Sequence, residues 1–122
     1  MAARRRRARS DRGAVTAEFA VALPALLLIV TFALGAVDAV LAKVQCVDAA
    51  RDAALVAARG GDGRTVGAGR APRGATVRIT RGADSVEVTV TLRVSPLGAH
   101  LGSFRVTAAS TATVEPGMVT AP

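Results

Sequence analysis

The residues of this chain that could do covalent or metal chemistry are few and isolated. The sequence holds one cysteine, Cys46, and one histidine, His100. These two do not make a zinc site, and a Cys46–His100 catalytic pair would lack the third group that orients the base. A single cysteine also excludes an internal disulfide. We therefore expect a structural protein with no enzymatic activity, no bound metal and no cofactor.

Glu18 has the most unusual setting of any ionisable residue, because a charge-free stretch follows it directly. Phe19 opens a run of 19 residues without a charge, which ends at Val37, just before Asp38. A carboxylate at the edge of hydrocarbon costs roughly a few kcal/mol unless it is paired with a cation or reaches lipid headgroups. Glu18 alone therefore has two interpretations. It awaits a cation, or it marks a boundary, since acidic side chains are favoured near helix N-termini.

The charge-free run predicts a transmembrane helix over residues 14–42. Only 2% of the 122 residues are aromatic although 51% are hydrophobic, so a soluble core built from this chain would be thin. As a helix, residues 19–37 would span about 28 Å, close to the thickness of bilayer hydrocarbon. A membrane would thus bury much of the apolar surface.

Positive charge is concentrated at the start of the chain. Residues 1–13 carry a formal charge of +5 out of +7 for the whole chain. By the positive-inside rule, this basic leader stays in the cytoplasm and everything after Asp38 lies outside. We expect the leader to lack regular structure. An arginine-rich head can also bind nucleic acid, but beside an apolar span topology explains it more simply, and we expect no nucleic acid partner.

A helical extension is predicted over residues 43–59, outside the membrane. Apolar residues at spacings of three and four predict one packed face, comprising Val44, Val47, Ala54, Leu55 and Ala58. The charged residues predict the opposite side: Lys43, Asp48, Asp52 and Arg59. Gly60 and Gly61 supply a stop signal. Residues 60–74 contain six glycines and predict a loop.

The last segment, residues 75–122, predicts a small β domain. From Ser85 to Val94 apolar and polar residues alternate, which indicates a strand with one buried face. A shorter alternating run over residues 76–80 precedes it, joined by a turn at residues 81–84. A third run, residues 103–114, places Phe104, Val106 and Ala108 on one side. We expect an α+β fold in which a three-stranded antiparallel sheet lies against the helical extension.

The junction between leader and apolar run resembles a prepilin peptidase site: Arg12-Gly13-Ala14-Val15-Thr16-Ala17-Glu18-Phe19. The resemblance implies cleavage after Gly13, which would leave Ala14 as the new N-terminus and Glu18 fifth in the mature chain. It also implies that Glu18, with Phe19 beside it, meets the free α-amine of a neighbouring subunit during assembly. With little competing water, that attraction would be strong. Glycine has no side chain, so an extended backbone at Gly13 could enter a narrow protease cleft.

Residues 11–59 as a whole resemble the TadE-like family, the pseudopilins and minor pilins of tight-adherence, Flp-type pili. The resemblance is carried by an apolar, proline-containing segment, residues 22–28, and an alanine-rich one, residues 47–54. It implies a single-pass protein of the bacterial inner membrane that takes part in pilus assembly and cell adhesion. The implied partners are the lipid bilayer, prepilin peptidase and other pilin or Tad-type assembly subunits. Small residues would allow close helix approach: Ala20, Ala22, Ala25, Ala33, Gly35 and Ala36.

Two other functions remain open from the sequence. Residues 1–42 could be a signal peptide cut after Ala39 or Ala42, giving a secreted protein, although the apolar run exceeds the usual length of such a segment. Alternatively, the chain could be a membrane-anchored binding protein that never assembles. The mature N-terminus discriminates, since a start at Ala14 supports the pilin and a start near Val40 supports secretion.

Overall fold

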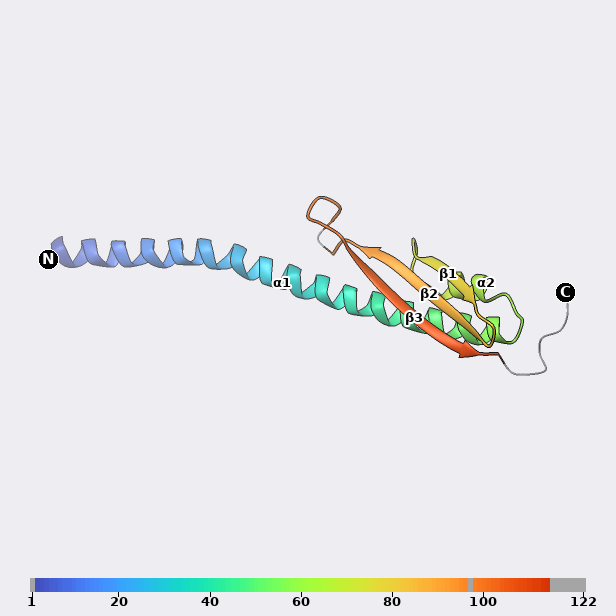
Figure 1. The fold of residues 1–122 in the computed structure, drawn as a ribbon. Helices are drawn as coiled ribbons and strands as arrows, with labels where there is room; N and C mark the ends of the chain where they lie inside the picture. The colour runs from blue at the N-terminus through green and yellow to red at the C-terminus, as the bar shows by residue number, and fades with distance from the viewer. Residues whose placement is uncertain (1, 97, 115–122) are drawn as a thin grey trace. The chain divides into compact units, whose positions relative to one another are not determined.

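The computed structural model describes residues 2–96 and 98–114, with burial and side-chain contacts from Asp11 onward. The elements follow in the order α1 (Ala2–Ala58), α2 (Gly63–Arg70), β1 (Thr76–Arg81), β2 (Ser85–Val94) and β3 (Phe104–Thr113), as Figure 1 shows. This confirms the predicted α+β class. The chain divides into two compact units, Met1–Leu34 and Gly35–Pro122.

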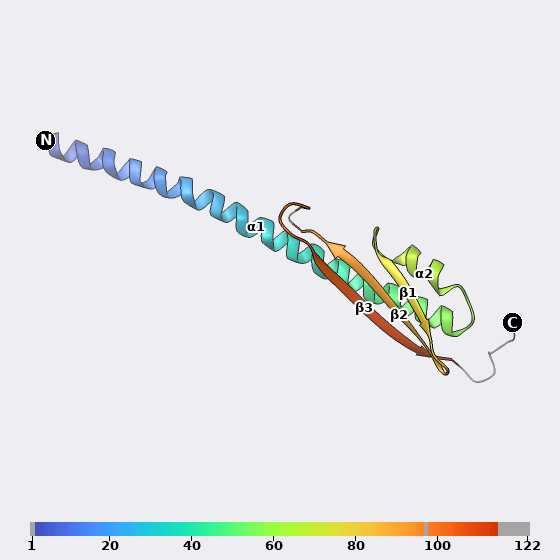
Figure 2. The same cartoon turned by 45° about the horizontal axis from the view of Figure 1, so that its top comes forward.

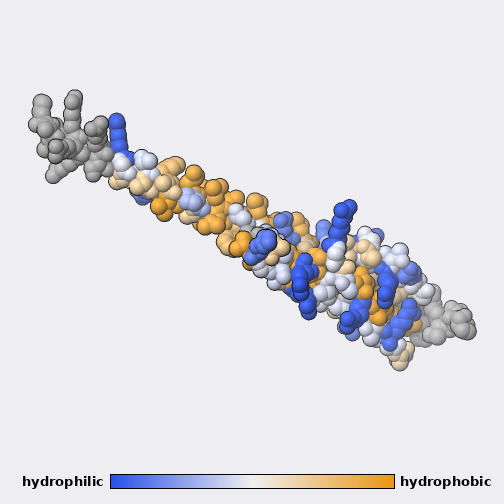
Figure 3. Space-filling model, turned by 90° about the horizontal axis from the view of Figure 1, so that it is seen from above, coloured by the Kyte–Doolittle hydropathy of each residue, from blue (hydrophilic) through white to orange (hydrophobic). Residues whose placement is uncertain are grey.

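The first unit consists of the N-terminal part of α1. The helix already begins at Ala2, so the expectation of an irregular leader over residues 1–13 is wrong. Alanine and arginine are both good helix formers, and the helix tolerates Gly13 within it. After Glu18 the surface of α1 is apolar and exposed (Figure 3). Within the described residues, one helix, α1, is long and apolar enough to cross a membrane.

The second unit contains the predicted sheet, with strand order β1-β2-β3 and antiparallel pairing throughout. In the first hairpin Thr76 lies opposite Thr91 and Arg81 opposite Val86. The Gly82 N–H closes the turn by donating to the Ser85 carbonyl over 2.7 Å. In the second pair the register runs from Ser85 opposite Thr113 to Val94 opposite Phe104. The bounds of β2 are those that its alternating pattern predicts.

The core of this unit lies between α1, from Cys46 to Ala57, and one face of the sheet, which runs along this part of the helix in Figure 2. Val86, Val88 and Val90 of β2 are almost completely buried, while the residues between them face away. Val106 and Ala108 of β3 extend the same face. Phe104, predicted on that side, is 45% exposed because it begins β3 at the end of the sheet.

The face of α1 that meets the sheet agrees with the predicted one at Ala54, which is completely buried, but differs from it at the larger residues. The buried residues are small ones: Cys46, Ala49, Ala50, Ala53, Ala54 and Ala57. Val44, Val47 and Leu55, predicted to pack, are 50%, 45% and 43% exposed. The methyl groups of alanine let the helix approach the β2 valines closely, so the larger apolar side chains are left on the other side. The charged residues do lie outside the core, as predicted.

The predicted loop over residues 60–74 contains a short helix, α2. Gly60, with φ of 80°, ends α1 as expected. Asp62 then caps α2, because its Oδ1 accepts a hydrogen bond from the Thr65 N–H over 3.2 Å. Arg70 at the other end forms an ion pair with Asp52 of α1 over 2.8 Å. The sequence pattern did not predict this helix because the segment is rich in glycine, which is a poor helix former.

Candidate functional site

Glu18 and Phe19 lie on the exposed surface of α1. Phe19 is 69% exposed and Glu18 is also exposed. Both belong to one uninterrupted helix, so their backbone groups are satisfied within the helix and only their side chains face the surroundings. The carboxylate of Glu18 is thus accessible to a partner, at the point where the charge-free run begins.

Gly13 and Ala14 lie inside α1, not in an extended segment. A Cβ atom added to Gly13 would meet nothing within 4 Å. The Thr16 hydroxyl donates to the Arg12 carbonyl over 2.9 Å, across this part of the helix. A protease that binds extended backbone must therefore unwind a turn here. Glycine makes this easier, because it costs a helix about 1 kcal/mol relative to alanine.

The helix places Ala14 and Glu18 one turn apart on the same face, since residues at i and i+4 are neighbours on a helix surface. Phe19 lies further around the helix. The structure therefore brings the predicted cleavage point and the predicted assembly carboxylate within one turn of each other. A chain that began at Ala14 would carry its amine beside its own Glu18 as well as within reach of neighbours.

Cys46 and His100 occupy unrelated settings. Cys46 is completely buried among the core alanines, and His100 is exposed in the segment between β2 and β3. Burial raises the pKa of the Cys46 thiol, and the nearby Lys43 opposes this effect. The neutral thiol is therefore favoured. Among the described residues, no group of three or more His, Cys, Asp or Glu side chains could hold a metal ion.

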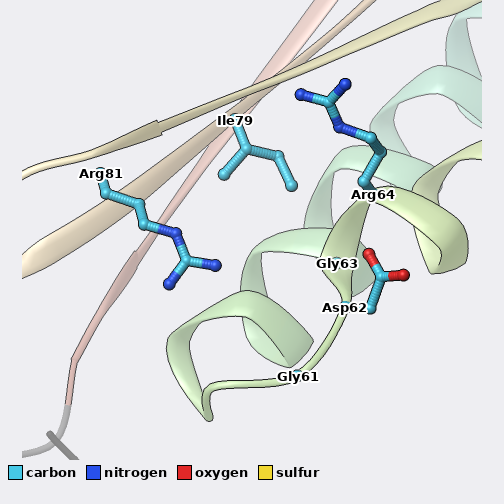
Figure 4. A pocket seen from close by; sticks show the side chains of 6 residues that line it. All are labelled: Gly61, Asp62, Gly63, Arg64, Ile79 and Arg81. Atoms are coloured by element: carbon cyan, nitrogen blue, oxygen red, sulfur yellow. The ribbon is translucent and has the colours of Figure 1, made fainter. Parts of the chain in front are cut away.

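A hollow of about 470 Å³ lies between α2 and β1. Figure 4 shows Arg64 and Arg81 reaching toward it from either side of Ile79. The third charged side chain at its edge, Asp62, is already engaged, and the hydrogen bonds from Thr65 lower the pKa of its carboxyl. The lining thus offers two guanidinium groups and backbone atoms, but no nucleophile beside a base.

A second apolar surface of α1 was missed by sequence reasoning, and we term it the outer stripe. It faces away from the sheet and comprises Val37, Val40, Leu41, Val44, Val47 and Leu55, each between 43% and 63% exposed. The spacing of three and four residues that predicted a packed face is real, but it belongs to this exposed side. The run of alanines at residues 49, 50, 53, 54 and 57 was the signal for the sheet-covered side.

Comparison with known proteins gives two matches and one negative result. Residues 13–55 match the family described as TadE-like protein. The chain is also 36% identical, over 106 residues, to a Mycobacterium tuberculosis protein named apoptosis inhibitor Rv3655c, an alignment that covers 85% of this chain and 82% of that relative. No solved structure matches. The family match covers the leader junction, the apolar run and most of the alanine face.

Proposed function

The chain belongs to the TadE-like family, and on that premise we propose that it is a pilin-like structural protein of a bacterial inner membrane. Prepilin peptidase removes residues 1–13, and the mature chain then takes part in the assembly of a Flp-type pilus, either within the fibre or at its base. Helix α1 is long and apolar enough to span a membrane, and the family is pilin-like and structural. Both observations are consistent with a single-pass membrane protein. The orientation, with the basic leader inside and the sheet outside, follows from the charge of the leader.

The observation that carries the proposal is the placement of Glu18. It is exposed, it directly precedes the charge-free run, and it lies one turn after Ala14 on the same helix face. Cleavage after Gly13 creates an α-amine at Ala14, which is the cation that this carboxylate lacks. Where water is scarce, the attraction between the two groups is many times stronger than in bulk solvent.

Two partners compete for Glu18 in this proposal. In a lone subunit, the amine of Ala14 lies one turn from its own carboxylate, which lowers the cost of holding Glu18 at the membrane edge. During assembly, the amine of a neighbour takes its place and sets the axial position of one helix against the next. The outer stripe supplies further contact between subunits, because Val44, Val47 and Leu55 are exposed beyond the span predicted over residues 14–42.

Cleavage and assembly are tested together by mass spectrometry of the mature N-terminus. In cells with prepilin peptidase we expect the purified chain to begin at Ala14, and in cells without it to keep its leader. The variant Glu18→Ala should still be cleaved but should be lost from the sheared pilus fraction. Asp38→Ala, which removes the acid at the other end of the run, is the matched control and should assemble normally.

Three results would contradict the proposal. A wild-type chain that still begins upstream of Ala14 in peptidase-positive cells removes the processing step. A chain that begins near Val40 shows secretion instead. If Glu18→Ala assembles normally, Glu18 only marks the membrane boundary. The proposed pairing of its carboxylate with the amine of a neighbouring subunit is then wrong.

A secreted or membrane-anchored binding protein is the second candidate, and one observation favours it. The compact unit Gly35–Pro122 holds the entire described core, so cleavage after Ala39 or Ala42 would leave the sheet and its helix face in place. The name of the relative, apoptosis inhibitor, describes an action that a released domain could share. Against this, Gly35 is buried against Pro96, and release would remove that contact. The same mass measurement decides between the two.

A further inference from the structure

The segment between β2 and β3, of which residues 95, 96 and 98–103 are described, contacts α1 through Pro96, close to the end of the charge-free run. Gly35 of α1 is buried there, and a Cβ atom added to it would lie 2.9 Å from the Cβ atom of Pro96. Gly35 was expected to help two helices approach each other; instead it makes room for this segment of its own chain. Figures 1 and 2 show the described part of this segment as a loop at the end of the sheet where β2 ends and β3 begins.

This contact fixes the depth of the segment once α1 is placed in a bilayer. Gly35 lies two residues before Val37, the last residue of the charge-free run. At 1.5 Å per residue, it is about 3 Å inside the end of that run. A span that fills the hydrocarbon therefore brings Pro96 to the boundary between acyl chains and headgroups.

The side chains and the backbone of the segment suit that boundary. Leu101 is 74% exposed and Phe104 is 45% exposed. The Gly98 N–H donates to the Ser95 carbonyl over 3.1 Å, and the Leu101 N–H donates to the Gly98 carbonyl over 3.2 Å. Backbone groups that are paired locally can leave water at lower cost.

Two arginines stand at the base of the same segment. Arg93 of β2 and Arg105 of β3 lie directly opposite each other in the sheet, and both are exposed. An exposed leucine alone needs no explanation on a soluble protein. Here the exposed apolar side chains of Leu101 and Phe104 lie next to two basic side chains, at the level where the span ends. An anionic membrane surface has the matching order, with acyl chains beneath negatively charged headgroups.

We propose that the described residues around this segment form a membrane contact, in which Leu101 and Phe104 enter the outer surface of the bilayer and Arg93 and Arg105 bind lipid phosphates. The proposal rests on the membrane span of the proposed function. The contact would attach the chain to the membrane at a second place, in addition to the span formed by α1. The small domain is then held at the lipid surface before assembly, and must release this contact to enter a pilus.

The test uses tryptophan as a depth probe, because the chain contains neither tryptophan nor tyrosine. The full chain carrying Leu101→Trp is reconstituted in vesicles of phosphatidylcholine and phosphatidylglycerol, with and without brominated acyl chains. Ala83→Trp is the matched control, since Ala83 is exposed in the turn at the opposite end of the strands. We expect a blue-shifted emission and strong quenching by brominated lipid for Leu101→Trp, and neither for Ala83→Trp.

The arginines are tested in the same assay. Quenching of Leu101→Trp should be stronger when phosphatidylglycerol is present, and Arg93→Gln with Arg105→Gln should abolish that difference. Equal quenching with and without anionic lipid overturns the assignment of the two arginines.

Failure of the loop contact and failure of the membrane span give different results. If the protein resists carbonate extraction from the vesicles while Leu101→Trp emits as in water, the span holds and the loop contact is wrong. If carbonate removes the protein from the vesicles, both the membrane span and the loop contact are wrong. A circular dichroism spectrum unchanged from the wild type shows that the tryptophan variant is folded.

Discussion

Gly63 and Gly67 lie one turn apart on α2, and both are buried where α2 meets neighbouring elements. A Cβ atom on Gly63 would lie 2.4 Å from the backbone carbonyl oxygen of Ala53. One on Gly67 would lie 3.1 Å from the Ala53 Cβ atom and from Val77 of β1. The two glycines thus weaken α2 as a helix but let it reach the alanine face of α1.

Adding one methyl group to α2 should therefore have opposite effects at two of its glycines. Gly63→Ala places a carbon against a backbone oxygen, and overpacking of this kind costs about 1–3 kcal/mol. Gly69→Ala meets nothing within 4 Å and should stabilise the protein by about 0.4–1 kcal/mol, because alanine restricts the unfolded chain. Thermal unfolding in detergent, followed by circular dichroism, measures both. Equal shifts for the two variants would refute the close contact.

At the scale of elements, the second half of α1 has two different apolar faces. The sheet covers the alanine face, and the outer stripe of valines and leucines stays exposed. Beyond residue 42 the stripe still leaves Val44, Val47 and Leu55 exposed, so this part of α1 has more hydrophobic surface than its own domain uses. The uncovered part is the surface through which we expect subunits to meet.

Enlarging a residue on each face should separate folding from assembly. Ala50 is completely buried, so Ala50→Leu should destabilise the domain by about 1–3 kcal/mol. Val47→Leu, on the outer stripe, should change the unfolding midpoint little, because exposed substitutions usually stay within about 0.5 kcal/mol. Val47→Asp should leave the fold intact and reduce recovery in the pilus fraction. A large loss of stability in either Val47 variant would place that residue in the core.

The elements that could be predicted are those with a strict period. The alternation from Ser85 to Val94 identified β2 to the residue, and the charge-free run identified the apolar part of α1. The packed face of α1 could not be predicted by ranking side chains by size. The valines of β2 pack against alanines, whose small side chains let the sheet lie close to the helix. α2 was missed because its glycines are required by contacts across the fold, which no local pattern reveals.

At the scale of the whole molecule, the positive charge is concentrated in the leader, residues 1–13. The leader holds a net +5, whereas the remaining chain is close to neutral at +2. The candidate site at Gly13, Ala14, Glu18 and Phe19 lies at the junction of this basic leader and the apolar run. Its residues could be named from the sequence, but the helical state of the predicted cleavage point could not. A resemblance to a protease site indicates how a substrate is bound by the protease, not how the free chain is folded.

Neutralising the leader should disturb the orientation of the chain. Replacing Arg4, Arg5, Arg6, Arg7 and Arg9 by Gln brings the net charge of residues 1–13 to zero, so the positive-inside signal is lost. We expect a smaller fraction of chains with the sheet outside, measured by protease accessibility in spheroplasts. The control replaces five exposed arginines of the second unit by Gln and should keep the orientation: Arg59, Arg64, Arg73, Arg78 and Arg81.

The alanine face of α1 has a further consequence for how the domain finds its alignment. Alanines at residues 49, 53 and 57 repeat at intervals of one turn, so a sheet displaced by one turn along the helix would meet nearly the same surface. Three contacts distinguish one position of the sheet along the helix from the next. Pro96 packs where Gly35 has no side chain, and the Lys43 ammonium group donates a hydrogen bond to the Thr107 carbonyl. Gly63 packs closely against Ala53, where a side chain would not fit. Changes at these three points should make the sheet slide along the helix before it detaches.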